Sequence, residues 1–241
     1  MHPTALKDSR GGHNHAQINQ DFFKTWSPAM SYILGFIFAD GAIEDVQKSS
    51  RTYYISITSK DLSILNSIKK FMSSTHKLYT KPLQKILYPG GKYYISSERF
   101  VLRIGSKNMY NDLLKLGVTP RKSLSIKFPI VPTEYLSFFI RGYFDGDGCL
   151  HLLKGIYPRL IFTSGSNQFF EGLSATLSQT LQIPIKSAYQ QLQQSNNFCY
   201  RLHYNTKISH LILEYMYRDL EKAPFLDRKY VIYQKYLQTK E

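Results

Sequence analysis

Two acidic residues in this sequence stand in closely similar surroundings. Asp40 ends the apolar stretch ILGFIFADG at residues 33–41, and Asp147 ends the stretch IRGYFDGDG at residues 140–148. A carboxylate at the C-terminal end of a helix faces the negative end of the helix dipole, which costs roughly 0.3–1 kcal/mol. Two such carboxylates brought together also repel each other, which raises the pKa of one of them.

A hard divalent cation would remove both of these penalties. Mg²⁺ binds one or two protein carboxylates, keeps several of its waters and contacts substrate phosphates. The two acids therefore predict a metal site for phosphodiester hydrolysis at which Asp40 and Asp147 converge. One Asp-Gly pair alone would mean little, because Asp-Gly is a common turn sequence. Its recurrence in matched surroundings favours the metal site.

Small residues beside each acid indicate how two helices could bring the acids together. Gly35 and Ala39 are four residues apart and share one helix face, and Gly142 and Gly146 repeat this spacing. Small residues at this spacing let two helix backbones approach closely. If the two helices pack side by side and parallel, their C-terminal ends meet and the two acids become neighbours.

The whole chain reads as two similar halves. Lys122 follows Asp40 at the same offset as Lys229 follows Asp147, because 122 − 40 equals 229 − 147. Each half reads αββαββα, an α+β unit, so we predict two pseudo-symmetric halves of a domain-sized repeat. The predicted ranges are a flexible tail over 1–26, a first repeat over 27–127 and a second over 128–241.

The expected elements follow from hydrophobic periodicity and turn residues. The expected helices are Ser27–Asp40, Leu62–Met72, Lys107–Leu116, Glu134–Asp147, Gln168–Leu181 and Ile208–Tyr217. The expected strands are Ala42–Lys48, Thr52–Ser59, Lys77–Leu87, Tyr93–Ile104, Cys149–Leu153, Pro158–Thr163, Ile185–Leu192 and Phe198–Tyr204.

The charge of the chain indicates a polyanionic partner. The 31 lysines and arginines exceed the 17 acids by 14, which favours nucleic acid, although ribosomal or membrane-surface binding would fit the charge alone. No stretch approaches the roughly 20 apolar residues of a membrane span. The polar N-terminal residues do not read as a secretory signal. Cys149 and Cys199 are expected as free thiols in a reducing compartment, so we expect an intracellular protein, cytoplasmic, nucleoid or organellar.

The two motif copies resemble those of the LAGLIDADG homing endonucleases, in particular a single-chain member with two repeats. The resemblance runs from about Ser27 to Gln238. It implies a saddle of two antiparallel sheets over DNA, with two parallel motif helices at the central interface. It also implies a monomer that binds double-stranded DNA and cleaves both strands of a long site in an Mg²⁺-dependent reaction, leaving 3′ overhangs. Mn²⁺ or Ca²⁺ would occupy the same sites.

The resemblance also assigns roles to individual residues. The catalytic, metal-binding acid of each motif is its last acid, here Asp40 and Asp147, with Gly41 and Gly148 beside the metal. The preceding acid is structural in the family; Asp145 keeps it, whereas Phe38 replaces it in the first copy. The resemblance implies two further pairs, catalytic Lys122 and Lys229, and Ser59 and Ser164 beside active-site water.

A DNA-reading surface is predicted from the alternation of strand residues, whose even and odd members face opposite sides of a sheet. Polar residues that fall opposite the apolar rows are candidates for base and phosphate contacts. An ordinary solvated sheet face is the alternative for each of them. The candidates are Arg51, Tyr54, Ser56, Thr58, Lys77, Lys81, Lys85, Arg99, Arg103, Arg159, Lys186, Gln190, Arg201 and His203.

Other functions remain open from the sequence. An intron maturase that binds its host intron RNA, or a non-catalytic nucleic-acid binder of the same fold, would share most of these features. A non-catalytic binder is expected to lose one of the two acids, and this chain keeps both. A basic ribosome-associated protein would leave the paired acids unexplained. Intron homing is the expected biological context.

Overall fold

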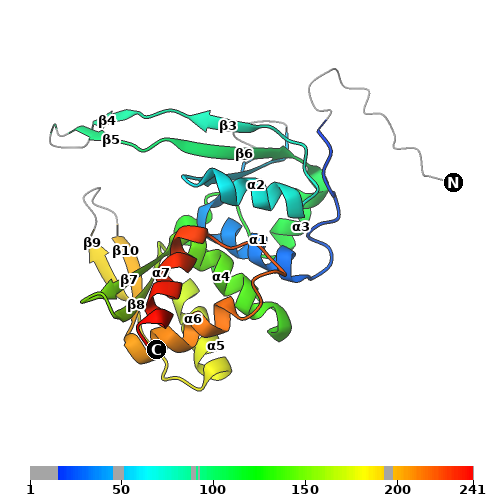
Figure 1. Ribbon diagram of the computed structural model, residues 1–241. Helices are drawn as coiled ribbons and strands as arrows, with labels where there is room; N and C mark the ends of the chain where they lie inside the picture. Colours follow the sequence, from blue (N-terminus) through cyan, green and yellow to red (C-terminus); the bar gives the residue numbers. More distant parts are fainter. Residues whose placement is uncertain (1–15, 46–51, 88–90, 92, 193–197, 241) are drawn as a thin grey trace.

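The computed structural model describes residues 16–45, 52–87, 91, 93–192 and 198–240, and it forms an α+β fold (Figure 1). Two short 3₁₀ helices, Lys122–Leu124 and Thr133–Tyr135, lie between its halves. The α-helices are α1 (Pro28–Asp40), α2 (Leu62–Phe71), α3 (Lys107–Lys115), α4 (Leu136–Asp147), α5 (Asn167–Leu181), α6 (Thr206–Tyr217) and α7 (Asp227–Gln238).

Two four-stranded antiparallel sheets repeat the same strand order, β1-β2-β6-β3 in half one and β7-β8-β10-β9 in half two. A separate pair, β4 and β5, continues the β3–β6 hairpin. The strands are β1 (Gly41–Ile43), β2 (Tyr54–Ser59), β3 (Leu78–Lys81), β4 (Lys85–Leu87), β5 (Tyr93–Ile95), β6 (Arg99–Gly105), β7 (Gly148–Leu153), β8 (Tyr157–Ser164), β9 (Tyr189–Leu192) and β10 (Phe198–Tyr204).

Helices α1 and α4 pack against each other at the centre of the molecule, as the small residues predicted. A Cβ atom added at Gly35 would lie 2.9 Å from the backbone nitrogen of Tyr143, and one added at Gly142 would lie 2.9 Å from that of Phe36. Farther along both helices, a Cβ at Gly146 would collide with Ala39. Because the contacts advance along both helices together, the helices are parallel and their C-terminal ends meet.

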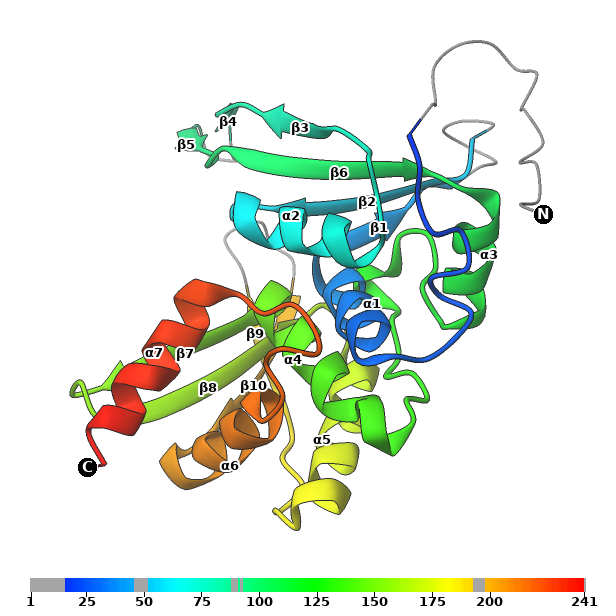
Figure 2. The same cartoon turned by 45° about the vertical axis from the view of Figure 1, so that its right-hand side comes forward.

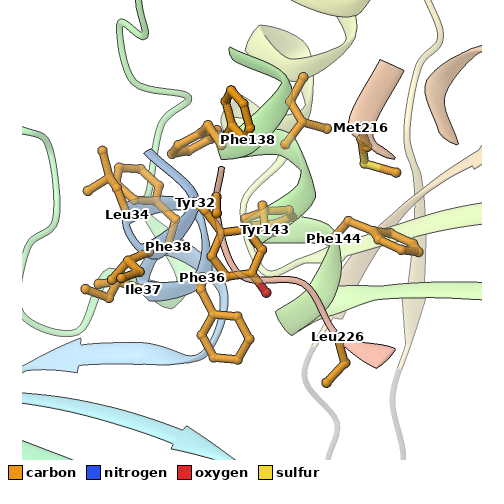
Figure 3. Packing of buried hydrophobic residues seen from close by; sticks show 14 of the residues in the cluster. Tyr32, Leu34, Phe36, Ile37, Phe38, Phe138, Tyr143, Phe144, Met216 and Leu226 are labelled. Atoms are coloured by element: carbon orange, nitrogen blue, oxygen red, sulfur yellow. The ribbon is translucent and has the colours of Figure 1, made fainter. Parts of the chain in front are cut away.

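Large apolar residues on these helices point away from the glycine contact into each half. Figure 3 shows Leu34 on the outer side of α1 and Phe144 on the other side of α4, the side on which Met216 lies. Phe38 instead packs across the helix pair, against Phe139 of α4 and Phe169 of α5. All four side chains are buried, with exposed fractions of 2% or less. The two halves therefore share a continuous core through the helix pair, which fixes the position of the helix ends.

The structure differs from the sequence prediction in several elements. Helix α7 was not predicted, although it carries Lys229; the matching residue of half one, Lys122, lies in a single 3₁₀ turn. The tail predicted for residues 1–26 is too long. Phe22 and Phe23 are buried, and Gln17 exchanges hydrogen bonds with Thr75, so this part of the predicted tail is packed against the protein. The Trp26 ring stacks on Tyr135. Residues 1–15 lie outside the described part of the chain.

The strand ranges also changed. The predicted strands Lys77–Leu87 and Tyr93–Ile104 are each divided in two, and the one predicted over Ile185–Leu192 begins at Tyr189. The strand predicted over Ala42–Lys48 ends at Ile43 within the described residues. Elsewhere the alternation held: in β2, buried Ile55 and Ile57 alternate with half-buried polar residues.

Candidate active site

A glycine directly follows each acid, at the point where the helix ends and the strand begins. Any other residue there would force neighbouring atoms to move. Gly41 and Gly148 have extended backbone, with φ of −97° and −96°, so neither is required by a left-handed conformation. A Cβ at Gly41 would lie 2.6 Å from the Ile37 Cα, and one at Gly148 would lie 2.5 Å from the Phe144 carbonyl oxygen. The chain therefore turns from helix to strand through a space that has no room for a side chain.

The structure brings Asp40 and Asp147 into one electrostatic environment. Burial raises the pKa of the Asp147 carboxyl to about 7, and repulsion from Asp40 adds to the shift. The pKa of Asp40 is also raised, mainly because surrounding protein displaces water, although this side chain keeps an exposed side. Nearby positive charges oppose the rise in both groups: Lys122 and Lys229 act on both acids, and Arg99 and Arg228 act on Asp40.

The two lysines cap the C-terminal ends of the motif helices. Lys122 Nζ donates to the carbonyl oxygens of Phe38 at 2.7 Å and Ala39 at 3.3 Å. Lys229 Nζ donates to the carbonyl oxygens of Asp145 at 2.9 Å and Gly148 at 2.6 Å, and also to that of Phe144. Cations at these ends compensate the negative end of each helix dipole.

The two lysines differ in the number of N–H donors that have no hydrogen-bond partner. Burial lowers the pKa of each to about 8, so both are mainly charged at neutral pH. An ammonium has three N–H donors. Lys229 uses all three on carbonyl oxygens, whereas one donor of Lys122 has no partner within the described part of the chain. Lys122 is thus free to donate to a phosphate oxygen or a water without breaking an existing bond.

Asp145 holds the second motif helix in place, as the structural role predicted for it requires. Its carboxylate accepts hydrogen bonds from the Tyr32 hydroxyl at 2.7 Å and the Leu226 amide at 2.9 Å. Leu226 directly precedes α7, so this bond fixes the start of the helix that carries Lys229. Arg141, fully buried on α4, donates to the carbonyl oxygen of Met216 in the last turn of α6 and to those of Asp219 and Ala223 in the segment that leads to α7.

The two serines predicted beside active-site water have local roles in the structure. Ser59 Oγ accepts from the Asp61 amide, and Ser164 Oγ accepts from the Ser166 amide, each at 3.1 Å. Both bonds shape the turn between a strand and the following helix. Asp61 in turn accepts from Arg228 of the other half, with its two carboxylate oxygens at 3.3 and 3.1 Å from Nε.

The predicted DNA-reading residues of half one gather on one sheet face. Pairing places Ser56 beside Arg103 and Lys81 beside Arg99, on the face opposite the buried Ile57 and Leu102. Arg103 is already engaged, because its guanidinium lies 2.7 Å from Glu44 and 3.7 Å from the Tyr54 ring centroid. Others on or near this face are Thr58, Lys77 and Lys85; Arg51 lies outside the described residues.

Half two presents a similar face, but the predicted placement of Gln190 on it is wrong. Arg201 pairs with Thr163, and His203 accepts or donates a 2.6 Å hydrogen bond with the Tyr189 hydroxyl. Gln190 pairs with Tyr200, on the core side, so it lies on the opposite face from Arg201. The alternation fixes this: Tyr189 and Gln191 are the β9 residues on the open face, together with Arg159 of β8.

Positive charge gathers on this second face. Burial and the charges of Arg201, His151 and Lys186 lower the pKa of His203. The histidine is therefore neutral at pH 7 while its neighbours attract anions. His151 of β7 was not among the predicted residues; its alternation with buried Leu150 would have placed it on this face.

The residues at the helix ends fit a divalent cation held with help from a substrate. No cluster of three or more His, Cys, Asp or Glu side chains occurs within the described ranges, so the protein donors amount to the Asp40 and Asp147 carboxylates. Mg²⁺ commonly takes two carboxylates and completes its shell with waters and phosphate oxygens. Burial raises the pKa of both carboxyls despite the nearby lysines and arginines, so a bound cation would further stabilise their charged forms. The predicted Gly148 carbonyl already accepts a hydrogen bond from Lys229.

Comparison with known proteins gives weak matches in sequence and a match in fold over nearly the whole chain. No protein-family model matches this sequence. The chain is 26% identical over 187 residues to a probable translation initiation factor IF-2 of Methanocaldococcus jannaschii, and 24% identical over 167 residues to DNA-directed RNA polymerase subunit Rpo1C of that organism. These matches cover 75% and 69% of this chain but span 14% and 16% of the curated relatives.

Solved structures match nearly the whole chain. The K262A mutant of I-SmaMI superposes with a TM-score of 0.52 at 14% identity, covering 88% of this chain and 90% of that one. This chain has the LAGLIDADG homing endonuclease fold. The homing endonuclease I-WcaI bound to its DNA recognition sequence gives a TM-score of 0.48 at 14% identity, covering 86% and 92% of the two chains.

Within this LAGLIDADG fold, α1 and α4 are the motif helices and Asp40 and Asp147 end them. At 14% sequence identity, the superposition on I-SmaMI establishes the fold of this chain and nothing about its activity. Its chemistry has to be argued from its own residues. Within the residues that the structure describes, no helix is long and apolar enough to cross a bilayer.

Proposed function

We propose that this chain is a homing endonuclease, which cleaves both strands of a long double-stranded DNA site by metal-dependent phosphodiester hydrolysis and leaves 3′ overhangs. One observation carries the proposal. Two carboxylates whose pKa values are raised converge at the ends of two packed parallel helices, between two basic sheet faces. No structural need of the fold explains a pair of acids at that point.

Each group would have a distinct task in hydrolysis. Asp40 and Asp147 would hold Mg²⁺, which when bound supplies charge neutralisation at a phosphate oxygen and an acidified water. The available N–H of Lys122 would donate to a phosphate oxygen as negative charge develops there. Lys229, whose donors are taken by carbonyl oxygens, would keep the Asp147 end of α4 fixed. The open sheet faces would bind the duplex on either side of the acids.

The distribution of related sequences supports the homing part of the proposal. The matched segments cover 75% and 69% of this chain, so they overlap, yet they lie in one translation factor and one polymerase subunit. A segment shared by proteins of different function is what a mobile coding sequence would produce. The maturase and the non-catalytic binder have no comparable supporting observation.

A cleavage assay on the joined flanks of the gene would test this function. The probe is a plasmid carrying the two genomic flanks of this coding sequence fused together, because a mobile gene interrupts its own target. With Mg²⁺, the wild-type chain is expected to linearise the plasmid at one position with 3′ overhangs. Asp40→Asn and Asp147→Asn are expected to retain binding and to reduce double-strand cleavage by at least ~10³-fold.

Asp21→Asn is the matched control, because Asp21 is an exposed acid whose partner is the neighbouring Lys24. This variant should cleave as the wild type does. Cleavage that survives in both motif variants, or in the presence of EDTA, would overturn the catalytic assignment. Tight binding without cleavage in Mg²⁺ and in Mn²⁺ would favour the non-catalytic binder instead.

A further inference from the structure

Arg228 and Asp61 form a hydrogen-bonded ion pair that joins the two halves. Arg228 lies in the first turn of α7 in half two, and its Nε lies 3.1 and 3.3 Å from the two carboxylate oxygens of Asp61, which caps α2 in half one. In Figure 2, the first turns of α2 and α7 face each other at the boundary between the halves. The pair therefore holds the start of α7 against half one.

Asp61 lies beside the place where Asp40 enters the half-one sheet. Gly41, the residue after Asp40, pairs with Ile57 of β2, and Asp61 follows shortly after β2 ends. Arg228 is thus held on the side of the sheet from which Asp40 projects. Its positive charge is one of those that oppose the rise in the pKa of Asp40 that burial causes.

Arg228 has donors that the ion pair does not use. A guanidinium carries five N–H donors, one on Nε and four on the two Nη atoms. The Nε donor goes to Asp61, and neither Nη atom has a hydrogen-bond partner among the described residues. The side chain is 58% exposed, so these donors can reach a bound phosphate. The next residue, Lys229, cannot do this, because its three donors are on carbonyl oxygens.

The segment that carries Lys122 makes the reciprocal contact with half two. A Cβ atom added at Gly165, in the turn between β8 and α5, would collide with the Ser123 carbonyl oxygen and would lie 3.1 Å from Cδ2 of Leu124. Gly165 follows the end of β8 much as Asp61 follows the end of β2. Each of the two basic segments therefore packs against the strand-to-helix turn of the opposite half.

The strongest opposing charges at the two acids also come from the opposite halves. Burial raises the pKa of Asp147, and Lys122 of half one is the strongest of the cations that oppose this rise. Burial likewise raises the pKa of Asp40, where the strongest opposing cation is Lys229 of half two and Arg228 contributes as well. Contacts and charges thus pair each acid with a cationic segment of the other half.

We propose that Arg228 is a further catalytic residue, which donates from Nη to the scissile phosphate beside Asp40, while Lys122 donates to the scissile phosphate beside Asp147. Asp61 is the positioning residue of Arg228. Each phosphate would then be served by an acid of one half and a donor of the other. This inference rests on the proposed endonuclease function.

The arginine takes part in hydrolysis without changing its own protonation. A water oxygen forms a bond to phosphorus, the bond from phosphorus to one sugar oxygen breaks, and that sugar oxygen gains the proton that the water loses. Negative charge develops meanwhile on the non-bridging phosphate oxygens. Arg228 stays charged and donates a hydrogen bond to one of them, as Lys122 does at the other phosphate.

Strand-specific cleavage tests the assignment. The substrate is a duplex of the joined gene flanks with a separate label on each DNA strand, cut by the full chain in Mg²⁺. Arg228→Met is expected to slow one DNA strand by roughly 10²-fold, as for the loss of one donor to a developing charge. The other DNA strand should keep its wild-type rate. The slowed strand should be the one that Lys122→Met leaves fast, and the double variant should slow both.

Two milder variants separate donation from a merely structural role. Asp61→Asn keeps the arginine but weakens its ion pair, so it should slow the same DNA strand by less than Arg228→Met does. Arg228→Lys keeps a cation that can donate to phosphate, so it should recover part of the rate. With Ca²⁺ in place of Mg²⁺, Arg228→Met should change DNA affinity far less than it changes cleavage.

Arg218→Met is the matched control, because Arg218 is another exposed arginine of half two. It pairs with Asp219 and lies over the Tyr215 ring. This variant should cut both DNA strands at the wild-type rate.

The outcomes separate this inference from the proposed function. If the wild type cuts both DNA strands and Arg228→Met does so equally fast, Arg228 has no catalytic role and the endonuclease function stands. Equal slowing of both strands would show that Arg228 acts only through the position of α7. Slowing of the same strand as in Lys122→Met would place both donors at one phosphate and overturn the crossed arrangement. If the wild type cuts neither strand, the endonuclease function fails together with this inference.

Discussion

The Lys229 ammonium lies 2.6 Å from the carbonyl oxygen of Gly148, the residue that follows the second motif acid. This bond joins α7 to the point where α4 becomes β7. The equivalent lysine of half one, Lys122, bonds the carbonyl oxygens of Phe38 and Ala39. Both lysines thus support the helix end that presents an acid, but with different numbers of bonds.

The number of bonds predicts an order of stability. Lys229→Met would remove three hydrogen bonds to carbonyl oxygens and Lys122→Met would remove two, at about 0.5–1.5 kcal/mol for each bond, offset in part by removal of a buried charge. The Phe144 oxygen keeps the Gly148 amide as a donor. We expect Lys229→Met to lower the free energy of unfolding by about 1 kcal/mol more than Lys122→Met. Urea denaturation measures the difference, and an equal or reversed order would contradict it.

The available donor of Lys122 predicts unequal cleavage of the two strands. Lys122→Met should slow cleavage of one strand by roughly 10²-fold, as expected when one donor to a developing oxyanion is lost. Nicked plasmid would then accumulate before linear product appears. Strand-specific end labels measure the two rates. Equal slowing of both strands would mean that Lys122 acts through the helix end and not at a phosphate.

The raised pKa of Asp147 predicts how stability depends on pH without metal. The folded-state pKa is about 7, above the unfolded value near 3.9, so the folded chain binds the extra proton between these values. Stability from this group is therefore present below about pH 4 and is lost as pH rises to about 7. Asp147→Asn removes that loss, so it should stabilise the metal-free chain at pH 8 by about 1–3 kcal/mol.

Thermal unfolding at pH 4 and pH 8 in EDTA would measure this effect. The gain from Asp147→Asn should be small at pH 4, where the wild-type carboxyl is also protonated, and largest at pH 8. Asp21→Asn serves again as the control, with no such trend expected from an exposed acid. A variant that is less stable than the wild type at pH 8 would show that the charged Asp147 is favoured by its surroundings.

Adding Mg²⁺ should offset the loss of stability that the charged Asp147 causes at high pH. A cation that binds the folded chain raises its stability by RT ln(1 + [L]/Kd), or about 2.7 kcal/mol at one hundred times Kd. At pH 8, Mg²⁺ should therefore raise the melting temperature of the wild type. Asp40→Asn and Asp147→Asn should lose most of that increase. If a variant with both substitutions showed the same increase in melting temperature as the wild type, the bound Mg²⁺ would lie elsewhere on the chain.

The close contact of α1 and α4 predicts a large effect of one methyl group. In Gly35→Ala the new Cβ would lie 2.9 Å from the Tyr143 backbone nitrogen, so the two helices would have to separate. We expect the free energy of unfolding to fall by about 3 kcal/mol, at the upper end for overpacking. Because the acids sit at the end of the pair, cleavage should fall as well. A variant of wild-type stability would contradict the packing.

Particular residues show how far the sequence could go. The spacing of Gly35, Gly142 and Gly146 predicted the close contact of the two helices, because a missing side chain at helical spacing permits close approach whatever surrounds it. Their parallel orientation was implied only by the family resemblance. The period-two pattern likewise predicted which side of β2 and β6 is buried, since Ile55 and Leu102 alternate with polar residues. Local patterns of this kind need no knowledge of distant contacts.

Tertiary structure decided the rest, because it depends on groups far apart in the chain. The sequence gives Lys122 and Lys229 at the same offset and cannot tell that one uses two donors and the other three, since 84 and 81 residues separate Lys122 from Phe38 and Lys229 from Gly148. The sequence predicted that repulsion would raise the pKa of one acid, but it could not identify that acid as Asp147 or give the burial that is the main cause of the rise. Residue types and spacing are local properties, whereas burial, charge proximity and donor counts exist only once the two halves have packed.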